Sequence, residues 1–215
     1  MSEIIKKRLC FDIGANIGNW CLTNINNYDK IIAIEASSII FNDLLKNCNN
    51  CNKKIHPLHY VICNNNCENI CFYHCYYDHN ISSINKDIYD NPYLSFCHKH
   101  FFNFKTISKS ITIDKLIEIY GKPDLIKINV EYCEYDCISS LNTKNDLLCF
   151  KWSFDFKDIS LKCLDHLEKI GYNKFYIQDK NDYNFKPNNE DFNHSITTIK
   201  NLLLNKNDWA MLWCK

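Results

Sequence analysis

The chain alternates short apolar runs with segments whose apolar residues recur at helical spacing. The apolar runs resemble strands that are buried on both faces of a sheet. They cover residues 9–13, 31–34, 55–63, 124–130, 147–156, 174–178 and 209–214. The helical segments lie between them, at residues 18–26, 37–47, 114–120, 131–141, 159–170 and 199–204. This order predicts an α/β fold, in which a mostly parallel sheet carries helices on both faces.

The same pattern predicts one domain over residues 1–215, with its core at about residues 9–156. Residues 70–73 form a further predicted strand, which can form a hairpin with a later segment, and residues 101–113 are strand-like again. Between them, residues 76–100 lose all periodicity, and such a long loop in a compact domain is usually functional or mobile. We therefore predict an insertion or lid at residues 76–110 and a variable connection at residues 180–206.

Composition and charge narrow the class of protein. Hydrophobic residues make up 46% of the chain, which excludes a disordered protein. The 25 basic and 25 acidic residues cancel, so no overall field attracts nucleic acid or a membrane, although a local basic groove remains an option. No apolar run approaches the ~20 residues that cross a bilayer, and the N-terminus lacks a signal-peptide core. We expect a cytoplasmic protein without a membrane partner. Its composition, rich in Asn, Ile and Lys, suggests an AT-rich organism or a large DNA virus, and a viral protein would act in the host cytoplasm.

The chain has 14 cysteines, and they are scattered through the predicted strands and helices. In a fold of this kind, reduced thiols are a better interpretation than a disulfide scaffold. Two pairs, Cys48 with Cys51 and His56 with His59, have spacings that could suit zinc. However, the linker between the pairs is short and the histidines fall on a predicted strand. We therefore expect buried thiols rather than a metal site.

The first candidate site follows the strand at residues 9–13. Asp12 ends that strand, and Gly14, Asn16 and Gly18 form a turn that opens a helix. The spacing is G-x-N-x-G, whereas a loop that cradles a pyrophosphate has the spacing G-x-G-x-x-G. The turn therefore indicates a ligand that approaches the backbone closely but is not a diphosphate.

The next strand adds an acidic residue at its end. Glu35 follows Asp12 by 23 positions (35 − 12 = 23), which suits a carboxylate that accepts both hydroxyls of a ribose. A nucleoside cofactor without a phosphate loop points to S-adenosylmethionine. The alternative is that Glu35 caps the following helix, for which Ser37 is the natural N-cap, and that Asp12 only closes a turn.

These motifs resemble the FkbM family of S-adenosylmethionine-dependent methyltransferases. The similar segments occur in the family's order, and they are F-D-I-G-A-N-I-G at 11–18, I-E-A at 34–36, I-S-S at 81–83, I-T-I-D-K-L at 111–116 and I-K-I-N-V-E-Y-C-E at 126–134. The last segment departs from the family's usual I-K-I-D-V-E-G-x-E at Asn129, which replaces Asp, and at Tyr132, which replaces Gly. The resemblance implies a Rossmann-like fold, with a seven-stranded sheet whose last strand is antiparallel.

The resemblance also implies the roles of individual residues. It places cofactor-binding residues at Asp12, Gly14, Asn16, Gly18, Glu35, Ala36 and Ile62. It places substrate-side residues at Ser82 and Ser83, so that the predicted lid would face the methyl acceptor. It places catalytic residues at Lys127, Asn129 and Glu131.

Those three catalytic candidates lie two positions apart at the end of a predicted strand, so strand alternation would direct them to the same side. A buried lysine needs a partner, and Glu131 is the nearest candidate for Lys127. A Lys–Glu pair with a purely structural role is the alternative. Asn129 cannot act as a base, which leaves the activity of the site in question.

The sequence therefore predicts an enzyme that binds S-adenosylmethionine and methylates a hydroxyl group on a sugar, a small molecule or a nucleic acid. Two alternatives remain open. The first is a methyltransferase acting on an RNA cap or on the ribose 2′-hydroxyl, which a local basic patch would favour. The second is a degenerate methyltransferase fold that serves as a binding or scaffold module, which Asn129 and Tyr132 would favour.

Overall fold

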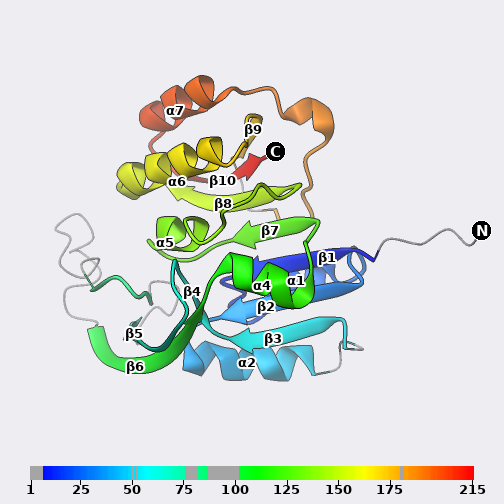
Figure 1. Cartoon of the computed structure of the whole chain (residues 1–215), viewed down its shortest axis with the longest axis vertical. Coiled ribbons are helices and arrows are strands. Elements are labelled where there is room, and N and C mark those ends of the chain that lie inside the picture. The colour runs from blue at the N-terminus through cyan, green and yellow to red at the C-terminus, as the bar shows by residue number, and fades with distance from the viewer. Residues whose placement is uncertain (1–6, 50, 52, 76–81, 87–101, 180–181) are drawn as a thin grey trace, which may run out of the picture.

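A seven-stranded sheet runs through the protein, with helices on both of its faces (Figure 1). This computed structural model describes residues 7–49, 51, 53–75, 82–86, 102–179 and 182–215. The strands of the large sheet are β1 (Leu9–Ile13), β2 (Lys30–Glu35), β3 (Ile55–His59), β7 (Leu125–Ile128), β8 (Leu148–Ser153), β9 (Phe175–Gln178) and β10 (Trp209–Cys214). Their order is β3-β2-β1-β7-β8-β10-β9, and only β10 runs antiparallel to its neighbours. The predicted Rossmann-like architecture is confirmed.

A smaller sheet extends from one edge of the molecule. It contains β4 (Val61–Ile62), β5 (Cys67–Cys75) and β6 (Phe102–Ile111), in the order β4-β6-β5. The predicted hairpin is confirmed, because β5 and β6 pair antiparallel. The single strand predicted at 55–63 is wrong: β3 and β4 belong to different sheets. The reason is that β2 ends at Glu35, opposite His59, so the chain beyond His59 has no partner in the large sheet.

The helices follow the predicted segments, with shifted ends. They are α1 (Asn19–Asn24), α2 (Ser38–Cys48), α4 (Ile113–Tyr120), α5 (Glu134–Ile138), α6 (Lys157–Lys169) and α7 (Ile196–Asn205), with 3-10 turns η3 (Phe154–Phe156) and η4 (Asn189–Asp191). The predicted N-cap is confirmed: the Ser37 hydroxyl accepts a hydrogen bond from the Ile40 amide at 3.4 Å. Helix α5 begins three residues later than predicted, because Tyr132 has a left-handed backbone with φ 65° that interrupts the helix.

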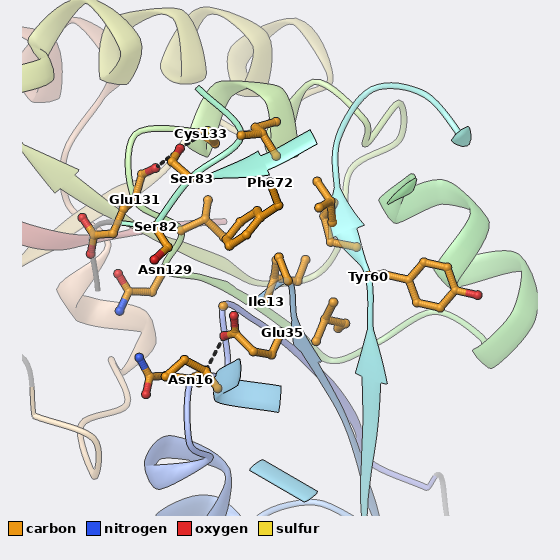
Figure 2. A pocket seen from close by; sticks show the side chains of 18 residues that line it. Ile13, Asn16, Glu35, Tyr60, Phe72, Ser82, Ser83, Asn129, Glu131 and Cys133 are labelled. Atoms are coloured by element: carbon orange, nitrogen blue, oxygen red, sulfur yellow. Dashed lines mark hydrogen bonds between the residues drawn. The ribbon is translucent and has the colours of Figure 1, made fainter. Parts of the chain in front are cut away.

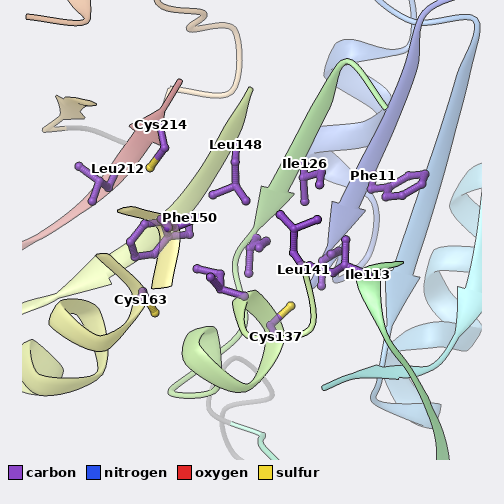
Figure 3. Packing of buried hydrophobic residues seen from close by; sticks show 14 of the residues in the cluster. Phe11, Ile113, Ile126, Cys137, Leu141, Leu148, Phe150, Cys163, Leu212 and Cys214 are labelled. Atoms are coloured by element: carbon purple, nitrogen blue, oxygen red, sulfur yellow. The ribbon is translucent and has the colours of Figure 1, made fainter. Parts of the chain in front are cut away.

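The sheet has a separate apolar core on each face. One core joins β1, β7, β8 and β10 to α4, α5, α6 and α7 (Figure 3). The other joins the opposite face of these strands to α1 and α2. Every residue of β1 is buried, as expected for a central strand of a parallel sheet. The two cores fix the carboxyl ends of the strands, where the loops gather.

Two predicted segments lie partly outside the described residues. Within the predicted lid at 76–110, residues 76–81 and 87–101 fall outside, and residues 102–110 belong to β6. Within the connection at 180–206, α7 is longer than predicted, because Ser195 caps it by accepting a hydrogen bond from the Thr198 amide at 3.2 Å. In the described part of the chain, the cysteines are free thiols and no helix is long and apolar enough to span a membrane.

Candidate active site

A pocket opens at the carboxyl ends of β1, β2 and β7 (Figure 2). Ligand sites in open α/β sheets occupy this position. Most of the lining is apolar and includes Ile13, Ile34, Ile62, Phe72 and Val130. The polar lining residues are Asn16, Glu35, Ser82, Ser83, Asn129 and Glu131. An apolar pocket with a few polar groups suits a nucleoside.

Glu35 is held rigidly at the base of this pocket. Its Oε2 accepts a hydrogen bond from the Asn16 amide at 2.9 Å, and its Oε1 accepts one from the Ser37 amide at 2.8 Å. Only 9% of the residue is exposed. Burial raises the pKa of the Glu35 carboxyl, and the amides of Ser37 and Asn16 oppose this by lowering it. Each carboxylate oxygen keeps a lone pair, so the group can accept hydrogen bonds from two neighbouring hydroxyls.

The glycine turn brings the ends of β1 and β7 into contact. Gly14 has φ 73°, and a Cβ atom at this position would lie 2.0 Å from the Asn129 carbonyl oxygen. The amides of Gly14 and Ala15 both donate to the Ile34 carbonyl at 2.9 Å, which ties the turn to β2. Only glycine fits this close approach and this backbone conformation. Gly14 therefore allows the turn that carries Asn16 to approach the backbone of Asn129 closely.

Asp12 and Lys127 form a buried ion pair outside the pocket lining. The two residues are opposite each other in β1 and β7, and Lys127 Nζ lies 2.7 Å from Asp12 Oδ1. The same ammonium donates to the Gly14 carbonyl at 3.3 Å, and the Cys21 thiol donates to Asp12 Oδ2 at 2.9 Å. Burial lowers the pKa of Lys127, but the Asp12 carboxylate outweighs burial, so that the pKa is raised overall. Asp12 and Lys127 therefore lie below the turn rather than in the cavity.

Glu131 pairs with Lys151 and not with Lys127, so the predicted partnership is wrong. Lys151 Nζ lies 2.7 Å and 2.9 Å from the two carboxylate oxygens of Glu131. The alternation assumed for Lys127, Asn129 and Glu131 fails because β7 ends at Ile128. Sequence reasoning missed Lys151, although a lysine inside the apolar strand 148–153 was a usable signal.

Glu134, the first residue of α5, is a second missed group beside this pair. It is buried, and burial, together with the nearby Glu131, raises its pKa well above the usual range. Its place in the segment 126–134 was visible in the sequence, but its burial was not.

Asn129 presents an unsatisfied acceptor beside the pocket. Its side-chain Oδ1 is buried, and no group among the described residues hydrogen-bonds to it. The backbone of the residue is fixed, because the Asn129 amide donates to the Ile13 carbonyl at 2.9 Å. Figure 2 shows the Asn129 side chain between Glu131 and Asn16. A buried orphan acceptor is costly unless a ligand supplies the donor.

The serines predicted on the substrate side also reach the pocket. The Ser83 hydroxyl donates to the Glu131 carbonyl at 3.0 Å, and the Ser82 hydroxyl accepts from the Cys75 amide at 3.1 Å. Ala36 and Ile62 line the pocket as well. Gly18 does not: it precedes α1, where a Cβ atom would lie 2.9 Å from Leu44 Cδ1, so it allows α1 and α2 to pack closely.

The cysteine and histidine pairs do not assemble into a metal centre in the described part of the chain, which holds no cluster of three or more His, Cys, Asp or Glu side chains arranged for a metal. His59 lies with Nε2 3.1 Å from the Ala36 carbonyl, and its ring stacks on Phe41 with centroids 5.0 Å apart. His56 contacts the ring of Tyr120. Each histidine therefore has a packing role of its own.

The family of the domain follows from its sequence. The sequence matches the methyltransferase FkbM domain over residues 12–158. Solved structures similar to this chain include a precorrin 8w decarboxylase from Methanobacterium thermoautotrophicum (10% identity, TM-score 0.49, 98% of this chain and 82% of that chain). Others are a fibrillarin pre-rRNA processing protein from Methanococcus jannaschii (14%, 0.48, 97% and 66%) and an S-adenosylmethionine-dependent O-methyltransferase from Thermotoga maritima (10%, 0.44, 98% and 60%). A search of curated proteins gave no match.

Proposed function

The chain belongs to the FkbM family of S-adenosylmethionine-dependent methyltransferases, and we propose that it methylates a hydroxyl group of its acceptor. The observation that carries this proposal is the carboxylate of Glu131, which lies at the pocket and is charge-paired with Lys151. Transfer of a methyl group to an unactivated hydroxyl requires removal of the hydroxyl proton, and a positioned carboxylate supplies that function.

Two residues of the pocket, Glu35 and Asn129, have side chains that suit S-adenosylmethionine. Glu35 can accept the two ribose hydroxyls, while its own hydrogen bonds to Asn16 and Ser37 keep it in place. The orphan Oδ1 of Asn129 can accept a hydrogen bond from the amino group of the methionine part. The cofactor supplies an activated methyl group on a sulfonium centre. The protein has to bind it, exclude water and align the acceptor.

Glu131 has the base role in this proposal. With the cofactor bound, the acceptor oxygen would bond to the methyl carbon as the bond from that carbon to the sulfonium sulfur breaks and S-adenosylhomocysteine is released, and the acceptor proton would pass to the Glu131 carboxylate. Lys151 is a positioning residue: its ammonium orients the carboxylate through two hydrogen bonds. Ser83 fixes the backbone of Glu131 by donating to its carbonyl. The half-buried position of the pair, 17% exposed for Glu131 and 22% for Lys151, limits screening by water.

The cofactor assignment predicts a loss of affinity when Glu35 is replaced. Glu35→Ala removes two acceptors from a buried diol, which should cost ~1.5–3 kcal/mol of cofactor binding, about 10- to 150-fold in affinity. Calorimetric titration with S-adenosylhomocysteine measures this loss directly. Glu118→Ala is the matched control, because Glu118 is an exposed glutamate paired with Lys115. Unchanged affinity in Glu35→Ala would contradict the assignment.

The Asn129 assignment predicts a gain of affinity. Asn129→Asp restores the family's carboxylate, and a charge-assisted hydrogen bond to the cofactor's amino group is about twice as strong as a neutral one. We expect S-adenosylhomocysteine to bind roughly tenfold more tightly, with turnover at saturating cofactor changed by less than about threefold.

The same variant tests the alternative of a degenerate module. Methyl transfer by wild type and Asn129→Asp is measured on sugars, nucleosides and capped RNA. A silent wild type with an active variant would support degeneration. Weaker cofactor binding in Asn129→Asp would instead show that the added charge repels Glu131 and that the amide is adapted to this site.

A further inference from the structure

Four aromatic residues lie after the carboxyl ends of β7 and β8 and at the start of β10, and we name them the aromatic lip: Tyr132, Phe154, Phe156 and Trp209. We propose that the aromatic lip is the acceptor subsite and that it stacks on the apolar face of a pyranose ring, directing one ring hydroxyl to Glu131. The inference rests on the proposed function and narrows its acceptor to a neutral sugar.

Strand pairing places the lip at the same edge as the pocket. Strand β10 runs antiparallel to β8, so its first residue, Trp209, lies opposite Ser153 at the carboxyl end of β8. The Phe154 amide donates to the Asp208 carbonyl at 3.3 Å, which joins the two ends. Lys151 then connects the lip with the site: its Nζ lies 5.9 Å from the Trp209 ring centroid and 2.7 Å from the Glu131 carboxylate.

Tyr132 keeps an aromatic ring at the lip despite an unfavourable backbone. Its φ of 65° lies in the left-handed region, which is a genuine outlier for a bulky residue and natural for the glycine of the family motif. Its ring packs on Phe156 with centroids 3.9 Å apart, and its chain neighbours Glu131 and Cys133 both line the pocket. Strained residues persist where a function depends on them. The aromatic side chain at 132 is therefore a feature of acceptor binding in this chain.

Two residues of the aromatic lip, Phe154 and Trp209, are exposed to solvent. Trp209 is 40% exposed and Phe154 is 42% exposed, although both are large apolar side chains. Aromatic rings offer a flat apolar face at low entropic cost, which suits the C–H face of a sugar ring. Asp155 and Asp208 are exposed next to these rings, and their carboxylates can accept hydrogen bonds from sugar hydroxyls.

The charges around the lip favour a neutral sugar over a nucleic acid. Binding to a phosphate backbone depends on lysine and arginine side chains that neutralise phosphates. Among the described residues that contact the lip, Lys151 is paired with Glu131, and Lys157 donates to the Leu204 carbonyl while lying over the Phe154 ring. The carboxylates of Asp155 and Asp208 would repel phosphate. A polyhydroxylated ring without charge fits this chemistry better.

The test is saturation-transfer NMR on the full chain loaded with S-adenosylhomocysteine. The probes are methyl glycopyranosides of glucose, galactose, mannose, fucose and rhamnose, with uridine and a short oligouridylate as comparison. We expect saturation of the ring C–H protons of at least one glycoside. The dissociation constant for that glycoside should be at least fivefold larger in Trp209→Ala and in Tyr132→Gly. Tyr132→Gly relieves the backbone strain, so it keeps the fold. Ile119→Ala is the control, because Ile119 is 54% exposed on α4 and outside the lip.

Calorimetry with S-adenosylhomocysteine on each variant separates the two proposals. Failure of the wild type to bind S-adenosylhomocysteine would overturn the proposed function. Cofactor binding without binding of any glycoside, or glycoside binding that Trp209→Ala and Tyr132→Gly leave unchanged, would overturn the acceptor subsite. Binding of the oligouridylate but of no glycoside would contradict the proposal of a sugar acceptor and would assign the aromatic lip to nucleic-acid binding.

Discussion

Glu131→Gln should lower the turnover number for methyl transfer by ~100- to 10,000-fold, because it removes the base while keeping the size of the side chain. The amide cannot take the proton of the acceptor hydroxyl. It can still hydrogen-bond to Lys151, so the local structure should survive. The measurement is transfer of a labelled methyl group to an acceptor identified by glycoside screening, at saturating cofactor.

Two controls make this result specific. S-adenosylhomocysteine affinity should change by less than about threefold, because Glu35 and Asn129 rather than Glu131 are assigned to the cofactor. Lys151→Met should lower turnover by a smaller factor than Glu131→Gln does, because the carboxylate stays in place but loses the two hydrogen bonds that orient it. Turnover of Glu131→Gln within tenfold of the wild type would remove Glu131 from the base role.

Local sequence signals predicted most of the fold because they act within one element. The strand at residues 9–13 and the final strand at 209–214 have the predicted bounds, since an apolar run with flanking polar residues leaves little freedom. The Ser37 cap was readable for the same reason. The break between β3 and β4 was not readable, because it depends on where the neighbouring strand β2 ends.

The candidate site residues could be proposed from the sequence, but their partners could not. Glu35, Asn129 and Glu131 line the pocket, and their roles stay predictions. The choice of partners depends on the strand order, which places β7 between β1 and β8. Lys127 therefore meets Asp12 on β1, and Glu131 meets Lys151 on β8. The predicted lid stays a prediction, because residues 76–81 and 87–101 are not described.

Lys127→Met should cost ~3–5 kcal/mol of the free energy of unfolding, because it leaves the Asp12 carboxylate buried without its charged partner. Neither residue is accessible, with Asp12 fully buried and Lys127 6% exposed, so water cannot replace the ammonium. Urea denaturation at pH 7 measures the loss. Because the pKa of Lys127 is raised in the folded protein, the pair's contribution is complete below the unfolded lysine pKa of about 10.4 and disappears as the pH rises through the folded value.

Two further variants, one in an exposed ion pair and one with both charges of the buried pair removed, distinguish a role of Lys127 in stability from a role in catalysis. Lys122→Met breaks the exposed pair with Asp146 and should cost less than ~1 kcal/mol. Asp12→Leu combined with Lys127→Met should recover part of the loss, because no unpaired charge remains buried. Cofactor affinity should also fall in Lys127→Met, since its ammonium holds the Gly14 carbonyl beneath the turn. If Lys127→Met instead keeps the stability of the wild type but abolishes turnover, Lys127 acts on the substrate as the motif first suggested, and the buried pair is not what holds the turn in place.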